Sequence, residues 1–133
     1  MVKLLTIDDS KTIRRVIAGI GAALGYEVLE AEHGAAGLEV LEQHADEVGL
    51  ILLDWNMPGM NGLEVLKTIK ANQNWKHIPV MMVTTEGERE YIIQAIQAGA
   101  IHYQTKPFTQ EDISARIMEA LGQGKGRSGG NVA

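Results

Sequence analysis

The feature that most constrains the fold is a regular alternation of short apolar runs with longer amphipathic stretches. The runs are only four or five residues long, which is typical of buried strands and too short for helices. We expect strands at residues 3–7, 27–31, 50–53, 80–83 and 100–104.

Apolar residues at helical spacing follow each run. Ile13, Val16, Ile17 and Ile20 occupy positions i, i+3, i+4 and i+7, one face of a helix that Gly25 ends. Four further helices are expected on the same grounds. Their markers are Leu38, Leu41 and Ala45; Leu63, Leu66, Ile69 and Lys70; Ile92, Ile93 and Ile96, before Gly99; and Ile113, Ile117 and Leu121.

Strict alternation of strands and helices predicts an α/β fold, in which a doubly wound parallel sheet of five strands carries helices on both faces. Right-handed crossovers leave few topologies, and we expect the flavodoxin-like order 2-1-3-4-5. The length of 133 residues suits one domain, which we place at 1–121. Residues 122–133 are rich in Gly, lack apolar periodicity and are predicted to be a flexible tail.

Composition excludes several classes of protein. The absence of Cys excludes a disulfide framework, a thiolate zinc site and a cysteine nucleophile. No stretch is apolar over the length of a bilayer, and the N-terminus turns acidic too soon for a secretory signal. The net charge of −5 argues against nucleic acid as a ligand. We therefore expect a cytoplasmic protein with neither a membrane nor a nucleic acid as its partner.

Polar residues suited to a functional site follow four of the predicted strands. Asp8 and Asp9 follow the first strand, Asp54 the third, Thr84 the fourth and Lys106 the fifth. Ligands of an open doubly wound sheet bind beyond the carboxyl ends of its strands. Because the first and third strands are neighbours in the expected order, three carboxylates would crowd one end of the sheet, beside a Lys and a Thr hydroxyl.

Such a group of carboxylates needs compensation. Two like unit charges about 4 Å apart repel by about 4 kcal/mol at an effective dielectric constant of about 20. Either one carboxyl group keeps its proton or a cation lies among them. Oxygen ligands select a hard ion, and a few carboxylates with open water positions suit Mg²⁺.

Each of these residues also has a local explanation. The acidic pair or Ser10 could cap the first helix, and Asp54 could be a turn residue. Thr84 could cap the fourth helix, and Lys106 could be a solvated charge. Four separate strand ends that supply compatible groups to one rim are harder to explain by chance, which favours a common site.

The segments "IDDS", "LLDWNMPGMNG", "VTTE" and "YQTKPF" closely resemble the receiver domain of bacterial two-component response regulators. The resemblance covers roughly residues 3–121 and implies the same sheet order. "DDSKTIRR" and "DWNMPGMNGLEVLKTIK" are especially similar to single-domain chemotaxis regulators. The resemblance implies that Asp54 is the phosphoacceptor and that Asp9, Asp54 and the backbone carbonyl of Asn56 ligate Mg²⁺, with Asp8 acting mostly through water.

The same resemblance assigns the remaining site residues. Lys106 would contact the phosphoryl oxygens, and the Lys106–Pro107 peptide would be cis. Thr84 would hydrogen-bond the phosphoryl group and shift on its arrival, and the rotamer of Tyr103 would report the state. Asn56 and Glu86 would influence the lifetime of the phosphate. No organic cofactor is implied.

The function implied by the resemblance is a phosphorylation-activated switch. A histidine kinase would supply the phosphoryl group, and phosphorylation would change the affinity of the chain for a downstream protein. The first candidate for that protein is the flagellar motor switch. The output face would comprise the fourth helix, fifth strand and fifth helix, near Ile92, although Ile92 itself is expected in the core. The chain would be a monomer that catalyses only its own phosphotransfer and dephosphorylation. It could alternatively be a phosphorelay receiver, or a receiver from a longer regulator.

Two rivals come from other classes. A phosphatase of the haloacid-dehalogenase type also uses Asp, Mg²⁺, Thr and Lys, but its nucleophile lies in an Asp-x-Asp motif after the first strand, whereas Asp8 and Asp9 are adjacent here. A flavodoxin-like electron carrier would need a phosphate-binding loop where these carboxylates lie. Arg14 and Arg15 are most simply explained as solvated charges on the first helix, although a kinase could use them.

Overall fold

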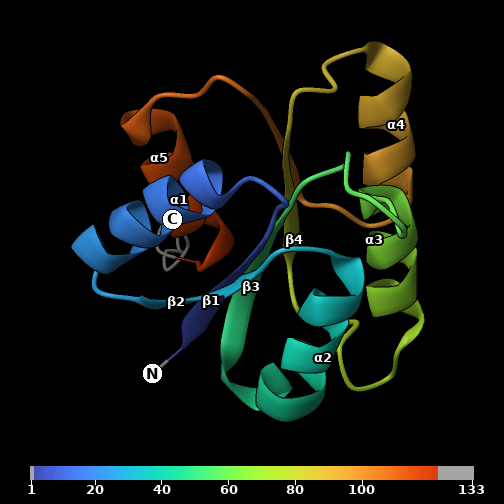
Figure 1. The fold of residues 1–133 in the computed structure, drawn as a ribbon, viewed down its shortest axis with the longest axis horizontal. Coiled ribbons are helices and arrows are strands. Elements are labelled where there is room, and N and C mark those ends of the chain that lie inside the picture. The colour runs from blue at the N-terminus through green and yellow to red at the C-terminus, as the bar shows by residue number, and fades with distance from the viewer. Residues whose placement is uncertain (1, 123–133) are drawn as a thin grey trace, which may run out of the picture.

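The computed structural model describes residues 2–122, which form a five-stranded parallel sheet with helices on both faces (Figure 1). The strands are β1 (Lys3–Ile7), β2 (Glu27–Ala31), β3 (Val48–Leu53), β4 (Val80–Thr84) and β5 (His102–Thr105). The helices are α1 (Lys11–Ala23), α2 (Gly34–His44), α3 (Gly62–Ala71), α4 (Arg89–Gln97) and α5 (Gln110–Ala120), with a short 3-10 turn, η1 (Ala45–Glu47), before β3. Of the predicted tail at 122–133, residues 123–133 lie outside the described residues.

The predicted topology is confirmed. The strand order is β2-β1-β3-β4-β5, and every neighbouring pair is parallel. Helices α1 and α5 lie on one face of the sheet, and α2, α3 and α4 lie on the other (Figure 1). Because all strands are parallel, their carboxyl ends meet at one edge of the sheet.

The central strands are buried on both faces, which explains why their sequences are apolar without alternation. Leu5 and Ile51 pack in the core beneath α2, α3 and α4, whereas Leu4 and Leu50 pack in the core beneath α1 and α5. All four side chains are fully buried. A charged side chain can therefore be accommodated only where a strand ends.

Helix ends follow ordinary capping chemistry. Ser10 caps α1, since its hydroxyl accepts a hydrogen bond from the Ile13 N–H at 3.2 Å. Asn61 and Glu64 form a capping box at the start of α3. Gly25, expected to end the first helix, has a φ of 94°, a left-handed conformation that favours glycine. The predicted end of α1 is thus confirmed, and of the two possible caps at its start, Ser10 is the one that the structure shows.

Three residues assigned to helix faces by their spacing are exposed rather than buried. Val16 is 43% exposed, Ile93 is 42% exposed and Ile96 is 47% exposed. Helix α4 packs against β5 and α3 at the margin of the sheet, and its fully buried side chain is Ala95. Ile92 is only partly buried, so the expectation that it lies in the core was wrong.

Three strands, β3, β4 and β5, differ from the predictions in their bounds, and β5 ends at Thr105 rather than at 104. Strand β3 begins at Val48, two residues before the expected 50, and β4 extends to Thr84. Strand β5 begins at His102 rather than at 100, because the Ala100 N–H donates to the Ala95 carbonyl at 3.0 Å and still belongs to the end of α4. Within residues 2–122, no helix combines the length and the apolar character needed to cross a membrane.

Candidate functional site

The four predicted strand ends converge at the carboxyl edge of the sheet. Asp8 follows β1 and Asp54 follows β3, and these strands are hydrogen-bonded neighbours in the sheet. Thr84 is the last residue of β4, and Lys106 directly follows β5. The Lys106 N–H donates to the Thr84 carbonyl at 2.9 Å, which joins the last two junctions.

The carboxylates form one cluster. Asp8, Asp9 and Asp54 each have an oxygen within 4.8 Å of the corresponding oxygens of the other two, and among residues 2–122 they are the only such group of three that could hold a metal ion. Asp8 is 2% exposed and Asp54 is 5% exposed, whereas Asp9 is exposed. The oxygen donor set, deep on one side and open on the other, suits a hard divalent cation that keeps part of its water.

Asp8 and Asp54 each make a local hydrogen bond in the turn after their strand and also belong to the acidic cluster. Asp8 Oδ1 accepts a hydrogen bond from the Ser10 N–H at 2.9 Å, and Asp54 Oδ1 accepts one from the Trp55 N–H at 2.7 Å. These bonds leave the second oxygen of each carboxylate for the cluster. The helix cap itself is Ser10, so neither Asp of the acidic pair serves that purpose.

Lys106 supplies a cation to the cluster. Its Nζ lies 2.7 Å from Asp8 Oδ2 and 3.5 Å from Asp54 Oδ2, and its side chain is 12% exposed. The alternative of a solvated charge is therefore wrong. The Lys106–Pro107 peptide is cis, as the resemblance implied.

The surroundings of Asp54 disfavour the charged form of its carboxyl group, even with Lys106 beside it. Burial raises the pKa of Asp54, and the neighbouring Asp8 charge raises it further; the Lys106 charge and hydrogen bonds from Thr84 and Trp55 oppose this only in part. One ammonium does not compensate the clustered carboxylates, so an additional cation would be stabilised here.

Thr84 and Tyr103 meet at the loop between β4 and α4. Thr84 is fully buried, and its Oγ1 accepts a hydrogen bond from the Glu86 N–H at 3.3 Å, so the alternative of a helix cap does not hold. The Tyr103 hydroxyl donates to the Glu86 carbonyl. Burial, followed by the Glu86 and Asp54 charges, raises the pKa of Tyr103 to about 12. The two residues predicted to form a switch thus contact the same short segment.

Asn56 and Glu86 also meet at this segment. Asn56 Nδ2 donates to Glu86 Oε2 at 2.6 Å, which joins the loop after β3 to the loop after β4. A hollow of about 370 Å³ adjoins Asp9 and is lined by Asp9, Trp55, Asn56, Met57, Pro58 and Asn61. A small molecule or a partner side chain could reach the acidic cluster from this side.

Three contacts of the site were missed by the sequence analysis. Gly62 packs so closely on the end of β3 that a Cβ there would lie 2.2 Å from the Asp54 carbonyl oxygen. Trp55 packs edge-on against Tyr91 of α4, with ring centroids 4.9 Å apart. Arg14 donates to the Asp8 carbonyl at 2.7 Å, so it is not merely a solvated charge. Only the Pro-Gly loop before Gly62 hinted at a tight approach.

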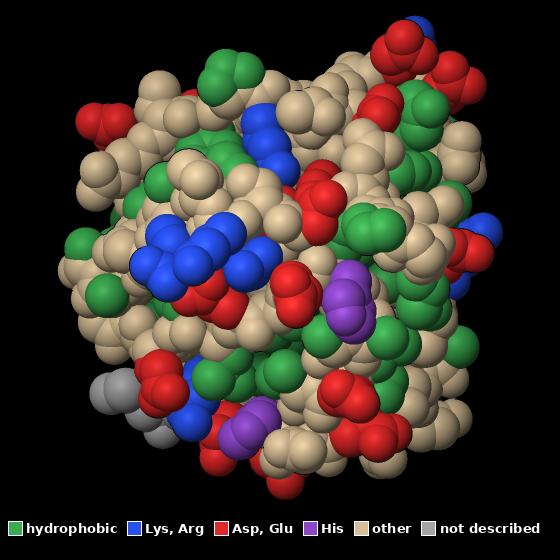
Figure 2. Space-filling model, in the orientation of Figure 1, with side chains coloured by type: hydrophobic (Ala, Val, Ile, Leu, Met, Phe, Trp, Pro, Cys, Tyr) green, Lys and Arg blue, Asp and Glu red, His purple; other side chains and the backbone are tan. Residues whose placement is uncertain are grey.

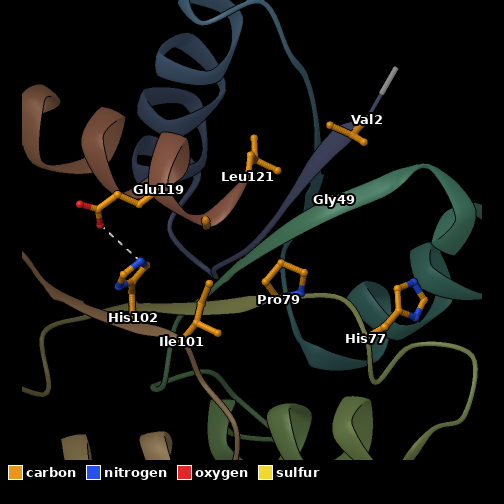
Figure 3. A pocket seen from close by; sticks show the side chains of 9 residues that line it. Val2, Gly49, His77, Pro79, Ile101, His102, Glu119 and Leu121 are labelled. Atoms are coloured by element: carbon orange, nitrogen blue, oxygen red, sulfur yellow. Dashed lines mark ion pairs between the residues drawn. The ribbon is translucent and has the colours of Figure 1, made fainter. Parts of the chain in front are cut away.

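A second hollow, of about 550 Å³, lies among the amino ends of the strands (Figure 3). Apolar side chains such as Val2 and Leu121 line it, and His102 pairs with Glu119 on one wall, their Nε2 and Oε1 atoms 3.4 Å apart. His77 lies on the opposite side of this hollow and does not join that pair (Figure 3). This hollow contains no member of the acidic cluster. The candidate functional site is therefore at the carboxyl end of the strands, not at this end.

A five-stranded sheet of order 2-1-3-4-5, with clustered carboxylates and a Lys at its carboxyl edge, is the arrangement of a receiver-type signalling domain. The model of the response regulator receiver domain matches residues 4–118, and the chain belongs to this family.

Individual relatives agree with this assignment. The chain is 46% identical over 121 residues to chemotaxis protein CheY1 of Helicobacter pylori, an alignment that covers 90% of this chain and 97% of the relative. It is 43% identical over 125 residues to a CheY homolog of Campylobacter jejuni, covering 93% and 95% of the two chains. Among solved structures, chemotaxis protein CheY4 of Vibrio cholerae superposes with a TM-score of 0.84 at 31% identity, covering 91% of this chain and 99% of that one.

Proposed function

We propose that the chain is a phosphorylation-activated switch, in which Asp54 accepts a phosphoryl group from a histidine kinase and the affinity for a downstream protein changes. The observation that carries the proposal is the position of Lys106 Nζ, 2.7 Å from Asp8 and 3.5 Å from Asp54. An ammonium and a metal-capable acidic cluster around one buried carboxylate are what phosphoryl transfer to that carboxylate requires.

Mg²⁺ is the proposed cofactor. Asp9, Asp54 and the backbone carbonyl of Asn56 would hold it, with Asp8 contributing mostly through water, because Asp8 Oδ2 is already engaged by Lys106. When bound, the ion would offset the negative charge that spreads over the phosphoryl oxygens during transfer. Membership of the receiver family and the mutual approach of the three carboxylates support this choice.

The proposed step is attack by an Asp54 carboxylate oxygen on the phosphorus of a phosphorylated histidine. An O–P bond forms, the P–N bond breaks, and the imidazole nitrogen keeps the electron pair and takes up a proton. Lys106 would move from Asp8 toward the phosphoryl oxygens, over a short distance because it already lies between the two carboxylates.

Thr84 and Tyr103 would convert this local event into a change of surface. A phosphoryl group adds strong acceptor oxygens close to the Thr84 hydroxyl. The Glu86 N–H donates to that hydroxyl and the Glu86 carbonyl accepts from Tyr103, so movement of Thr84 would alter the segment that Tyr103 contacts. The loop before α4, and with it the α4–β5–α5 face, would then change its affinity for a partner.

The Asn56–Glu86 hydrogen bond supports a role for both residues in the lifetime of the phosphate. Asn56 lies two residues beyond Asp54, so this bond is close to the proposed phosphoacceptor, and we expect water to reach the acyl phosphate more readily when it opens. Loss of the bond would therefore change the rate of dephosphorylation without removing the phosphoacceptor.

The names of the relatives support a role in chemotaxis. The relatives in Helicobacter pylori, Campylobacter jejuni and Pseudomonas aeruginosa are each called chemotaxis proteins. A protein of the flagellar motor switch is accordingly the proposed downstream partner. We propose a cytoplasmic monomer that acts on protein, not on nucleic acid or membrane, and that catalyses only its own phosphotransfer and dephosphorylation.

The proposal is tested by incubating the chain with Mg²⁺ and acetyl phosphate, with phosphoryl uptake followed by intact-protein mass. Uptake is expected in the wild type, is expected to depend on Mg²⁺, and should be lost in Asp54→Asn but retained in Asp8→Asn. Steady hydrolysis of small phosphate esters, without a lasting adduct, would instead favour the phosphatase alternative. Undiminished uptake by Asp54→Asn would overturn the proposed phosphoacceptor.

A further inference from the structure

We propose that Arg14 is a positioning residue for the acidic loop: by holding the Asp8 carbonyl, it sets the direction in which the Asp9 carboxylate points. This inference rests on the proposed function, in which Asp9 is a magnesium ligand. It assigns a role to a side chain that the site chemistry itself does not use.

The loop between β1 and α1 is short, and its two carboxylates are held differently. Asp8 is fixed at every polar group: its N–H donates to the Ala31 carbonyl at 3.1 Å, its carbonyl accepts from Arg14, and its carboxylate accepts from Ser10 and Lys106. Asp9 is exposed, and no hydrogen bond or ion pair joins its carboxylate to another residue of the described segment. No other side chain therefore holds the Asp9 carboxylate, and the backbone fixes the point and direction from which this side chain starts.

The Asp8 carbonyl belongs to the peptide that connects Asp8 to Asp9. Because a peptide group is planar, the bond from Arg14 to this oxygen fixes the plane from which the Asp9 Cα departs. A rotation of this plane would move the Asp9 carboxylate away from Asp54. Arg14 thus acts on the exposed ligand through the backbone, without touching its side chain.

The Arg14 guanidinium is also bound to a residue outside the acidic loop. Its Nε donates to Glu30 Oε1 of β2 at 3.2 Å while its NH1 group reaches the Asp8 carbonyl at 2.7 Å. The Arg14 side chain is only 13% exposed in this ion pair. The guanidinium makes these bonds through two different nitrogens that its planar fork holds apart, whereas a Lys would have to reach both acceptors from one nitrogen.

Arg15 provides the comparison within the same helix. Figure 2 shows Lys and Arg side chains gathered over α1 with acidic side chains beside them. The Arg15 side chain is exposed and makes no hydrogen bond or ion pair within residues 2–122. Both arginines belong to α1, the helix that follows the acidic loop, and a positive charge there disfavours a divalent cation in the loop. Loss of charge alone would therefore tighten Mg²⁺ binding, whereas loss of positioning would weaken it.

The first test is calorimetric titration of the full chain with Mg²⁺. Arg14→Gln is expected to bind Mg²⁺ about tenfold more weakly, the usual scale for loss of a group that orients a metal ligand. Arg14→Lys keeps the charge but not the fork, so it should also bind more weakly. Arg15→Gln should match the wild type or bind slightly more tightly. Unchanged or tighter binding by Arg14→Gln, or wild-type binding by Arg14→Lys, would overturn the proposal.

The second test is made without metal. The amide N–H of Asp9 shares its peptide with the Asp8 carbonyl, so its NMR resonance and hydrogen exchange report the orientation of that plane. Both should change in Arg14→Gln and Arg14→Lys but not in Arg15→Gln, while all variants keep a cooperative thermal transition. An unchanged Asp9 amide in the Arg14 variants would overturn the inference. Failure of the wild type to bind Mg²⁺ would instead count against the proposed function.

Discussion

The Lys106 ammonium donates to Asp8 Oδ2 at 2.7 Å across 98 residues of sequence, and both side chains are largely buried. This ion pair holds the fifth βα junction against the first. Removal of one partner from a buried pair leaves an uncompensated charge, which typically lowers stability by about 3–5 kcal/mol.

We therefore predict that Lys106→Met lowers the free energy of unfolding by about 3 kcal/mol without Mg²⁺, and that added Mg²⁺ restores much of this loss. Mg²⁺ should also bind more tightly, because a competing cation is gone. Urea unfolding with and without Mg²⁺ measures both effects. Lys11→Met, at an exposed residue of α1, is the matched control and should change little. An unaltered metal-free stability of Lys106→Met would contradict the account.

A second prediction concerns Asp54 and pH. Burial and the Asp8 charge raise the pKa of Asp54 in the folded protein above its ordinary value of 3.8, so the folded state binds this proton more tightly than the unfolded state does. Ionised Asp54 thus lowers stability at neutral pH, and the loss disappears as the pH falls through the raised pKa. Metal-free Asp54→Asn should have a higher Tm than the wild type at pH 7, and the two values should converge below pH 4. Equal Tm values at pH 7 would show that the carboxylate is not destabilised.

Tyr103 gives a prediction at alkaline pH. The pKa of Tyr103 is raised to about 12 from an ordinary value of 10.0, so between these values the unfolded chain loses the proton while the folded chain keeps it. The tyrosine therefore lowers stability as the pH rises above 10. Tyr103→Phe should lose less stability than the wild type over this window in chemical unfolding. Parallel pH profiles would indicate that the Tyr103 hydroxyl is not buried beside the Glu86 and Asp54 charges.

Much of the fold followed from the sequence because the central strands are buried on both faces. Residues 50–53 are a continuous apolar run, so the charge at Asp54 identified the strand end. The predicted carboxylates and Lys106 were found together for the same reason: parallel strands end at one edge of the sheet. Periodicity alone could not say that Ile93 and Ile96 are exposed, because a helix at the sheet margin is covered on only one side.

Other parts of the site depend on contacts that no local pattern encodes. The partners of Arg14 are the Asp8 carbonyl and Glu30, the latter 16 residues away, and the bond between Asn56 and Glu86 spans 30 residues. The need for glycine at position 62 arises from the backbone of Asp54 and not from the conformation of Gly62 itself.

Gly62 provides a steric prediction. A Cβ at this position would lie 2.2 Å from the Asp54 carbonyl oxygen and 2.7 Å from the Trp55 Cα, both backbone atoms that cannot easily move. Gly62→Ala should therefore destabilise the protein by about 1–3 kcal/mol and slow phosphoryl uptake by displacing Asp54.

Gly19→Ala is the matched control for this substitution. Gly19 lies in α1, and a Cβ added there would meet nothing within 4 Å beyond its chain neighbours and the nearby backbone of its own helix, so alanine should stabilise the helix by up to about 1 kcal/mol. Urea unfolding of both variants measures the contrast. Similar stabilities for the two variants would contradict the close approach of Gly62 to β3.

The most direct test of the central claim is chemical mapping of the phosphoryl group. The protein is incubated with Mg²⁺ and acetyl phosphate, treated with borohydride, which reduces an aspartyl phosphate to homoserine, and digested for peptide mass spectrometry. The account predicts homoserine at position 54 and at neither Asp8 nor Asp9. Homoserine at position 8 or 9, or a phosphoryl adduct that resists borohydride, would contradict it.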